Sequence, residues 1–97
     1  MYHHAMIRSF AEREAKSIFE GGGSRRYSGL ERMIRRKLLA IHAARLLNDL
    51  TIPPGNRLEA LRGDRRGQHS IRINDQYRIC FRWEEPYAHD VQIVDYH

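Results

Sequence analysis

In the second half of the chain, apolar residues recur at every second position. The segments 57–61 (RLEAL), 69–73 (HSIRI), 77–83 (YRICFRW) and 89–97 (HDVQIVDYH) all follow this alternation to some degree. A period of two is typical of a β-strand with one buried face. Short stretches rich in Gly, Asn, Asp or Pro separate the segments, including a loop at 62–68. The pattern therefore predicts consecutive antiparallel strands.

The first half of the chain has a helical pattern instead. Residues 11–19 predict a short helix, stopped by the glycines at 21–23. From Ser28, with Glu31 three residues later, the sequence fits the capping-box pattern S-x-x-E. A second helix of about twenty residues, roughly 30 Å long, is then expected to run to Leu50, before a proline pair that cannot continue it.

The apolar residues of this longer helix form two rows. One row consists of Leu30, Met33, Ile34, Leu38 and Ile41, and the other of Leu39, Ala43, Leu46, Leu47 and Leu50. One row can cover a sheet. The other must meet either the short helix or a partner protein, because a long exposed row of leucines is unusual. We favour packing against the short helix.

These elements predict an α+β fold in a single domain spanning 6–97. Residues 6–10 (MIRSF) alternate and are expected to form a short first strand. Two N-terminal helices would then pack on one face of a small, curved, mainly antiparallel sheet and leave its other face free. Residues 1–5 (MYHHA) are interpreted as an N-terminal extension or an expression remnant, so their histidines are poor candidates for metal ligands.

Charge is distributed unevenly along the chain. The formal net charge is +5, from 17 basic and 12 acidic residues, and only Lys16 and Lys37 of the basic residues are lysines. Residues 56–82 contain seven arginines, whereas residues 83–97 contain acidic residues and no Lys or Arg. An arginine-rich region suggests a polyanion partner such as nucleic acid, with a merely soluble basic surface as the alternative.

Cysteine content and hydropathy bear on the compartment. Cys80 is the only cysteine, so no internal disulfide can form, and we interpret it as a packing residue rather than a nucleophile. No apolar run approaches the ~20 residues that a membrane span requires. We therefore expect a cytoplasmic protein without membrane contact.

Strand alternation assigns the arginines to a face. In 77–83 it places Arg78 and Arg82, with Cys80 between them, opposite the apolar side chains, and Arg72 should share their face. His69 alternates with the apolar set and is interpreted as a hydrogen-bonded structural residue. The loop would add three arginines at the rim, namely Arg62, Arg65 and Arg66. Arg78 has no carboxylate nearby on its own strand, which favours an anionic ligand.

The run 61–81 fits the pattern LxGDRxGxxSIRxNxxxRxxF, and the chain ends in DYH. Together with MIRSF near the start, these residues resemble the HigB toxins of bacterial type II toxin–antitoxin modules, a branch of the RelE-like superfamily. The resemblance implies an endoribonuclease that inhibits translation by cleaving mRNA in the ribosomal decoding site. It also implies that no metal and no cofactor take part, because the ribose 2′-hydroxyl attacks its own adjacent phosphate.

The resemblance assigns roles to individual residues. His97 matches a terminal catalytic histidine, Tyr96 a neighbour that shapes the site, and Arg78 an arginine that grips the scissile phosphate. Arg62 stands where a relative has lysine, and it cannot readily donate a proton as a lysine can. Glu59 stands where the relative has histidine; it is either the general base, with His97 as acid, or a partner that holds Arg62 or Arg78 through an ion pair.

The same resemblance implies partners. Contacts to RNA and the ribosome are expected from Arg65, Arg66, Arg72 and Arg82. A HigA-type helix-turn-helix antitoxin should silence the toxin, and operator DNA should be bound only through that complex. Two alternatives remain: a ParE-like inhibitor of DNA gyrase on the same scaffold, and a catalytically degenerate antitoxin-binding co-repressor.

Overall fold

The computed structural model describes residues 6–96, so the extension predicted at 1–5 lies outside the described residues. Its helices are α1 (Arg13–Phe19) and α2 (Glu31–Ala43), and its strands are β1 (Glu59–Ala60), β2 (Gln68–Arg72), β3 (Tyr77–Glu84) and β4 (Tyr87–Asp95). Three short 3-10 helices are η1 (Leu47–Thr51), η2 (Pro54–Asn56) and η3 (Gly63–Arg65). The strands pair antiparallel in the order β1-β2-β3-β4. The predicted α+β fold is confirmed.

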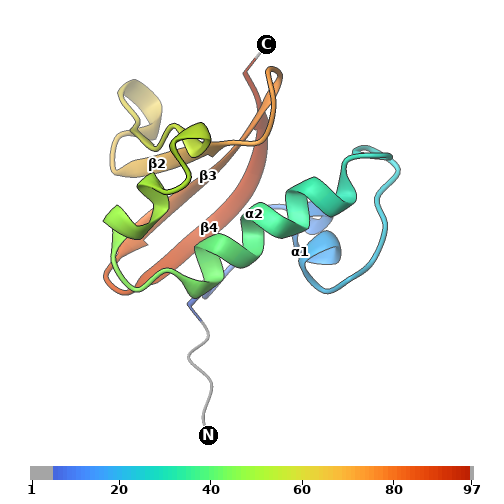
Figure 1. Cartoon of the computed structure of the whole chain (residues 1–97), viewed down its shortest axis with the longest axis horizontal. Helices are drawn as coiled ribbons and strands as arrows, with labels where there is room; N and C mark the ends of the chain where they lie inside the picture. The colour runs from blue at the N-terminus through green and yellow to red at the C-terminus, as the bar shows by residue number, and fades with distance from the viewer. Residues whose placement is uncertain (1–5, 97) are drawn as a thin grey trace, which may run out of the picture.

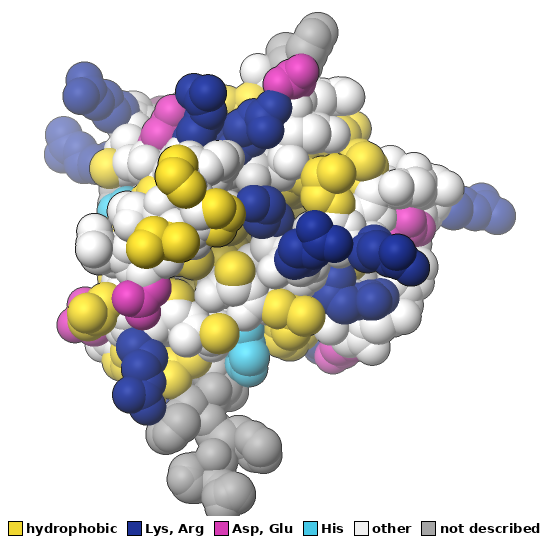
Figure 2. Space-filling view, in the orientation of Figure 1, with side chains coloured by type: hydrophobic (Ala, Val, Ile, Leu, Met, Phe, Trp, Pro, Cys, Tyr) yellow, Lys and Arg dark blue, Asp and Glu magenta, His cyan; other side chains and the backbone are white. Residues whose placement is uncertain are grey.

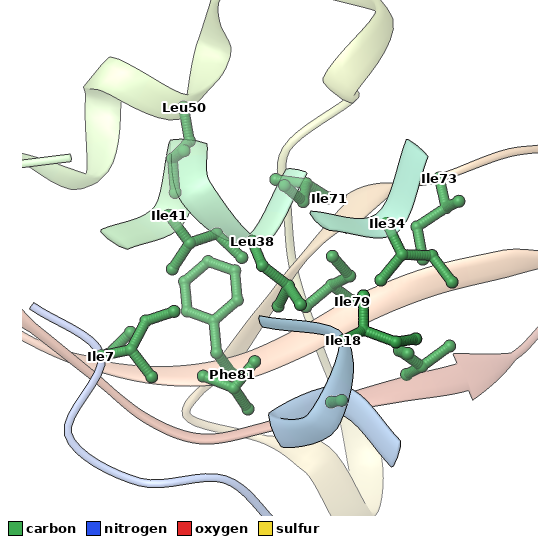
Figure 3. Packing of buried hydrophobic residues seen from close by; sticks show 14 of the residues in the cluster. Ile7, Ile18, Ile34, Leu38, Ile41, Leu50, Ile71, Ile73, Ile79 and Phe81 are labelled. Carbon is green, nitrogen blue, oxygen red and sulfur yellow. The ribbon is translucent and has the colours of Figure 1, made fainter. Parts of the chain in front are cut away.

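Both helices lie against the same face of the sheet (Figure 1). The core is built from the side chains that alternation assigned to that face, as Figure 3 shows for Ile71, Ile79 and Phe81, which gather near Ile34 and Leu38 of α2. All five are fully buried. Burial of each such side chain contributes roughly 1.5–3 kcal/mol, so this layer positions the strands that carry the site.

The second helix is shorter than the sequence pattern predicts. It ends at Ala43, and Ala44 turns into extended backbone (ψ 133°). The Asp49 carboxylate accepts hydrogen bonds from the backbone N–H groups of Arg45 (3.0 Å) and Leu46 (3.1 Å), which stabilises the break. These contacts allow Leu50 to fold back into the core, where it is buried. The prediction of one helix to Leu50 is therefore wrong.

The prediction of a capping box at the start of α2 is also wrong. The residue at the N-cap position is Leu30, and no side chain caps the helix there. Instead, Glu31 accepts hydrogen bonds from the backbone N–H groups of Gly29 (2.8 Å) and Ser24 (3.2 Å). The glutamate thus holds the preceding loop rather than pairing with Ser28.

The break in the helix divides its second apolar row. Leu50 reaches the core, but Leu39 is 48% exposed and Leu46 is 51% exposed. The expectation that this row packs against the short helix is wrong for these two leucines. Helix α1 instead contacts α2 at Arg35, whose Nε donates a hydrogen bond to the carbonyl of the buried Ile18 (2.9 Å), and at His42, whose ring lies 5.2 Å from that of Phe19.

The segment 6–10 does not form a regular strand. It runs parallel to part of β4 through two isolated bridges, Ile7 with Ala88 and Phe10 with Val91. Ile7 is nonetheless buried in the core, so the alternation correctly indicated an apolar face. Within residues 6–96, no helix has the length and apolarity needed to cross a membrane.

Candidate functional site

The face of the sheet opposite the helices carries the polar side chains predicted for it. Cross-strand pairs place Arg72 opposite Arg78 and Ser70 opposite Cys80. This face is not free, however, contrary to expectation. Ser70 and Cys80 are fully buried, and Arg78 is only 8% exposed. The segment around η2 contacts β2 and covers part of this face, because the chain returns across it after the helix break.

Arg78 is held in one orientation by neutral acceptors. Its Nε donates to Ser70 Oγ (2.7 Å), and its Nη2 donates to the carbonyls of Ser70 (3.3 Å) and Arg57. A carboxylate oxygen of Glu59 lies 3.9 Å from Nη2, at the outer limit of an ion pair, and that side chain is 55% exposed. A buried positive charge with such distant compensation favours a bound anion.

Arg78 lies at an open hollow of about 440 Å³. Four residues singled out from the sequence line it: Arg78, Glu59, Tyr96 and Arg72. Three others that the sequence pattern did not single out complete the lining: Arg57, Asn74 and Asp75. Asn74 and Arg72 do belong to the motif at 61–81, and the hairpin between β2 and β3 brings them together with Arg78. Motif membership was therefore an available signal for Asn74, whereas Arg57 was indicated only as one of the seven arginines in residues 56–82.

The Tyr96 side chain lies beside Arg78. Its ring centroid is 5.9 Å from the Arg78 guanidinium carbon, and its hydroxyl is 3.9 Å from Cys80 Sγ. Partial burial and the neighbouring thiol raise the pKa of Tyr96, against the opposing charges of Arg65 and Arg78. The phenol therefore stays protonated at neutral pH and can donate a hydrogen bond into the hollow.

Burial likewise raises the pKa of the Cys80 thiol, although its contact with Tyr96 and the charges of Arg65 and Arg78 oppose the shift. A fully buried thiol that stays protonated is a poor nucleophile. Cys80 thus acts as a packing residue beneath the site, in agreement with the prediction.

The remaining predicted arginines do not line the hollow. Arg62 and Arg66 are exposed on the loop around η3. Arg62 precedes η3 with extended backbone (φ −126°, ψ 179°), and the hollow is formed without it. Arg65 donates to Gln68 Oε1 (3.2 Å) and is close enough for its charge to lower the pKa of Tyr96.

Arg82 has carboxylate partners of its own. Its Nε lies 3.0 Å from an oxygen of Asp90, and its Nη2 lies 3.5 Å from an oxygen of Glu84. Arg72 also forms an ion pair, with the exposed carboxylate of Asp75. Of the arginines that alternation placed on this face, Arg78 has the most distant carboxylate among these ion pairs.

His97 lies outside the described residues, so its predicted catalytic role remains a prediction. Tyr96, the residue before it, lines the hollow. No cluster of three or more His, Cys, Asp or Glu side chains suited to a metal ion occurs between residues 6 and 96.

Positive charge also extends beyond the sheet. Figure 2 shows Lys and Arg side chains gathered over α2 on the face of the molecule seen there. Basic residues of α2 are Arg32, Arg35, Arg36 and Lys37. Burial lowers the pKa of Lys37, and the nearby charges of Arg36 and Arg72 lower it further. Lys37 therefore lies between the basic surface of α2 and Arg72 at the hollow.

A family model described as the RelE-like toxin of the type II toxin–antitoxin system HigB matches residues 8–97. The chain belongs to the HigB-like toxin family. Toxin HigB-1 of Vibrio cholerae serotype O1 is 48% identical to it over 61 residues, which are 63% of this chain and 64% of that protein. An uncharacterized protein of Haemophilus influenzae is 42% identical over 57 residues, 59% of this chain and 56% of that protein. Each match spans less than two thirds of the relative's own length.

The family assignment confirms the resemblance that the motif at 61–81 and the terminal DYH indicated. In this HigB-like chain three positions of the motif, Arg72, Asn74 and Arg78, line a single hollow, whereas Arg65 of the motif does not. Pairing between β2 and β3 thus converts the linear motif into a compact site.

Proposed function

We propose that this HigB-like toxin is a metal-independent endoribonuclease that cleaves mRNA in the decoding site of the ribosome. The observation that carries the proposal is the setting of Arg78, a buried guanidinium held by neutral acceptors at the hollow that Tyr96 and Glu59 also line. A guanidinium of this kind suits a phosphate, because its planar fork matches two phosphate oxygens.

The proposed reaction is an attack of the ribose 2′-hydroxyl on its own adjacent phosphate. The 2′-oxygen bonds to phosphorus, the bond from phosphorus to the 5′-oxygen breaks, and a cyclic phosphate remains on the 5′ fragment. Arg78 stabilises the negative charge that develops on the phosphate oxygens, and Tyr96 donates a hydrogen bond beside it. His97 protonates the departing 5′-oxygen.

Glu59 is the proposed base that removes the 2′-hydroxyl proton. Its carboxylate lines the hollow and is 55% exposed, so a ribose bound there can reach it. The competing role of Glu59 is to orient Arg78 through an ion pair. This role is supported only by a distance of 3.9 Å between Glu59 Oε1 and Arg78 Nη2. Arg62 is better suited to binding RNA than to the chemical step, since it is exposed on the η3 loop.

The remaining exposed positive charge would dock the toxin on RNA. Arg65, Arg66 and Arg72 lie on or next to the loop and hairpin that flank the hollow, whereas Arg82 contributes less because Glu84 and Asp90 compensate it. Docking should weaken as salt increases, because arginine–phosphate contacts release counterions. The proposed partners are mRNA and the ribosome in the cytoplasm and an antitoxin of the HigA type, through which the complex would reach operator DNA.

The test is cleavage of a defined mRNA on purified ribosomes by the wild-type chain and by His97→Ala. We expect codon-phased cuts from the wild type and a rate at least about 100-fold lower from the variant, in the range for loss of a general acid. His89→Ala is the matched control, because it makes the same change at a histidine of β4 that does not line the hollow, and it should cleave at the wild-type rate. Intact mRNA with the wild-type chain, together with inhibition of purified DNA gyrase, would favour the ParE-like alternative.

A further inference from the structure

Asn56 is the centre of a buried polar contact that the motif does not include. Its side chain is fully buried, and its Nδ2 group donates to the carbonyls of Leu50 (3.1 Å) and Ile52 (3.3 Å). Its Oδ1 accepts a hydrogen bond from Nζ of Lys37 on α2. Every polar group of this amide is thus used: Nδ2 ties the segment 50–56 to itself, and Oδ1 attaches the segment to α2.

The next residue along the chain contacts the site directly. Arg57 has a left-handed backbone (φ 46°), which is uncommon for a residue other than glycine. In this conformation its carbonyl accepts a hydrogen bond from Arg78 Nη2, and its side chain lines the hollow. The carbonyl that orients Arg78 therefore directly follows the segment 50–56 that Asn56 holds in place.

We propose that Lys37 and Asn56 are positioning residues for Arg78, and the proposal rests on the function proposed above. Lys37 holds the Asn56 side chain through its hydrogen bond to Oδ1, and Asn56 in turn holds the segment that follows η1 through the Leu50 carbonyl. The carbonyl of Arg57, the next residue, then orients the Arg78 guanidinium at the hollow. The contact joins residues 19 positions apart in sequence, so α2 and the segment before β1 act as one support. Neither residue lines the hollow.

Lys37 could instead act only through its charge, since it is half-buried and its charge interacts with that of Arg72 at the hollow. The two roles differ in what they change. A charge effect should alter binding of the anionic substrate and should be shared by Arg36, the exposed neighbour on α2. A positioning effect should lower the rate constant of cleavage at saturating ribosome concentration and should not be shared.

The deciding experiment is single-turnover cleavage on ribosomes by Lys37→Met, Lys37→Arg and Arg36→Met. We expect Lys37→Met to lower the saturating rate constant by about tenfold to 100-fold, the loss produced by a displacement of the order of 1 Å, with the half-saturating ribosome concentration unchanged. Lys37→Arg, which keeps a donor for Asn56 Oδ1, should restore most of the rate. Arg36→Met loses the same charge and should keep the wild-type rate at saturation.

A double-mutant cycle tests the route through Asn56. Asn56→Leu keeps the number and branching of the side-chain heavy atoms but removes all three hydrogen bonds, and adding Lys37→Met to it should cause no further loss of rate. Thermal unfolding checks that Asn56→Leu folds. If it does not, the Lys37 variants alone test the positioning role. Equal losses in Lys37→Met and Arg36→Met, or a wild-type saturating rate in Lys37→Met, would overturn the proposal.

A second readout does not depend on RNA cleavage. The NMR signal of the Arg78 Nε–H group, assigned by its absence in Arg78→Lys, should exchange slowly with water because it donates to the buried Ser70 hydroxyl. Faster exchange of this proton in Lys37→Met but not in Arg36→Met supports the positioning role. This holds even if the wild-type chain does not cut mRNA, since that failure would refute only the proposed function. Unchanged exchange in Lys37→Met, with wild-type cleavage, refutes positioning alone.

Discussion

The two ends of β3 place two arginines in opposite electrostatic surroundings. Arg78 and Arg82 are four positions apart and share a strand phase. Arg78 is 8% exposed and is held by a hydroxyl and two carbonyls, with Glu59 at 3.9 Å. Arg82 has a half-exposed side chain and lies 3.0 Å from Asp90 and 3.5 Å from Glu84.

The difference arises from the chain that packs beside each end. β4 carries Asp90, Glu84 ends β3 itself, and an irregularity in the pairing of the two strands occurs between Cys80 and Arg82. Asp90 there adopts φ 54° and supplies the carboxylate that meets Arg82. The other end is covered by the η2 segment, which offers the carbonyl of Arg57. The comparison teaches that an arginine becomes a candidate anion ligand through its neighbours rather than through its strand phase.

The largest expected effect comes from exchanging each arginine for lysine. Arg78→Lys keeps the charge but loses the planar fork, and we expect single-turnover mRNA cleavage to slow by about 100-fold to 1000-fold. Arg82→Lys should cleave at the wild-type rate, because nearby carboxylates already compensate that charge. Similar losses in the two variants would show that the two ends of β3 do not differ in function.

The carboxylates provide a second comparison between the ends. Glu59→Ala should lower the single-turnover rate at least about tenfold if the glutamate is the general base. Glu84→Ala removes a carboxylate from the other end and should leave the rate unchanged. A wild-type rate for Glu59→Ala would leave Glu59 with a purely structural role.

A smaller effect is expected at Tyr96. Tyr96→Phe keeps the ring beside Arg78 but removes the hydroxyl, so the rate of cleavage should fall by a factor of about 3 to 10, as for loss of one neutral hydrogen bond. The thermal unfolding temperature should change little. Within residues 6–96 the only contact found for the hydroxyl is with the Cys80 thiol, at 3.9 Å. A large drop in that temperature would instead assign Tyr96 a structural role.

The smallest effect concerns pH and His69, which pairs with Phe81 near the Arg82 end. Its ring stacks on Phe81 with centroids 6.3 Å apart, and its Nδ1 finds no hydrogen-bond partner within residues 6–96. Its position on the core face is as predicted, but Nδ1 makes no hydrogen bond of the kind predicted for the ring. Burial lowers the pKa of His69, so the folded state favours the neutral ring.

The stabilisation from neutral His69 should be fully present above pH ~6.5, the ordinary value for histidine, and should be lost as pH falls toward the lowered folded-state pKa. We expect the free energy of unfolding of the wild type to decrease in this window more than that of His69→Gln. Chemical denaturation at pH 7.5 and pH 5.5 measures the difference. Equal pH dependence in both proteins would contradict it.

Local patterns in the sequence determined the strands and their faces. The period of two placed Ile71, Ile79 and Phe81 in the core and Arg72 and Arg78 on the other side, because successive side chains of a strand must point in opposite directions. The same alternation put Arg72 and Arg78 on one face, and the hairpin between β2 and β3 brings both to the hollow.

Tertiary structure decided which of those residues could form the site. The helix break at Ala44 and the return of the chain over Ser70 depend on contacts between distant residues, such as Lys37 with Asn56, that no local period reveals. These contacts buried Arg78, added Arg57 to the hollow and left Arg62 exposed. Alternation fixes the direction of a side chain, but only packing between distant segments determines what it meets there.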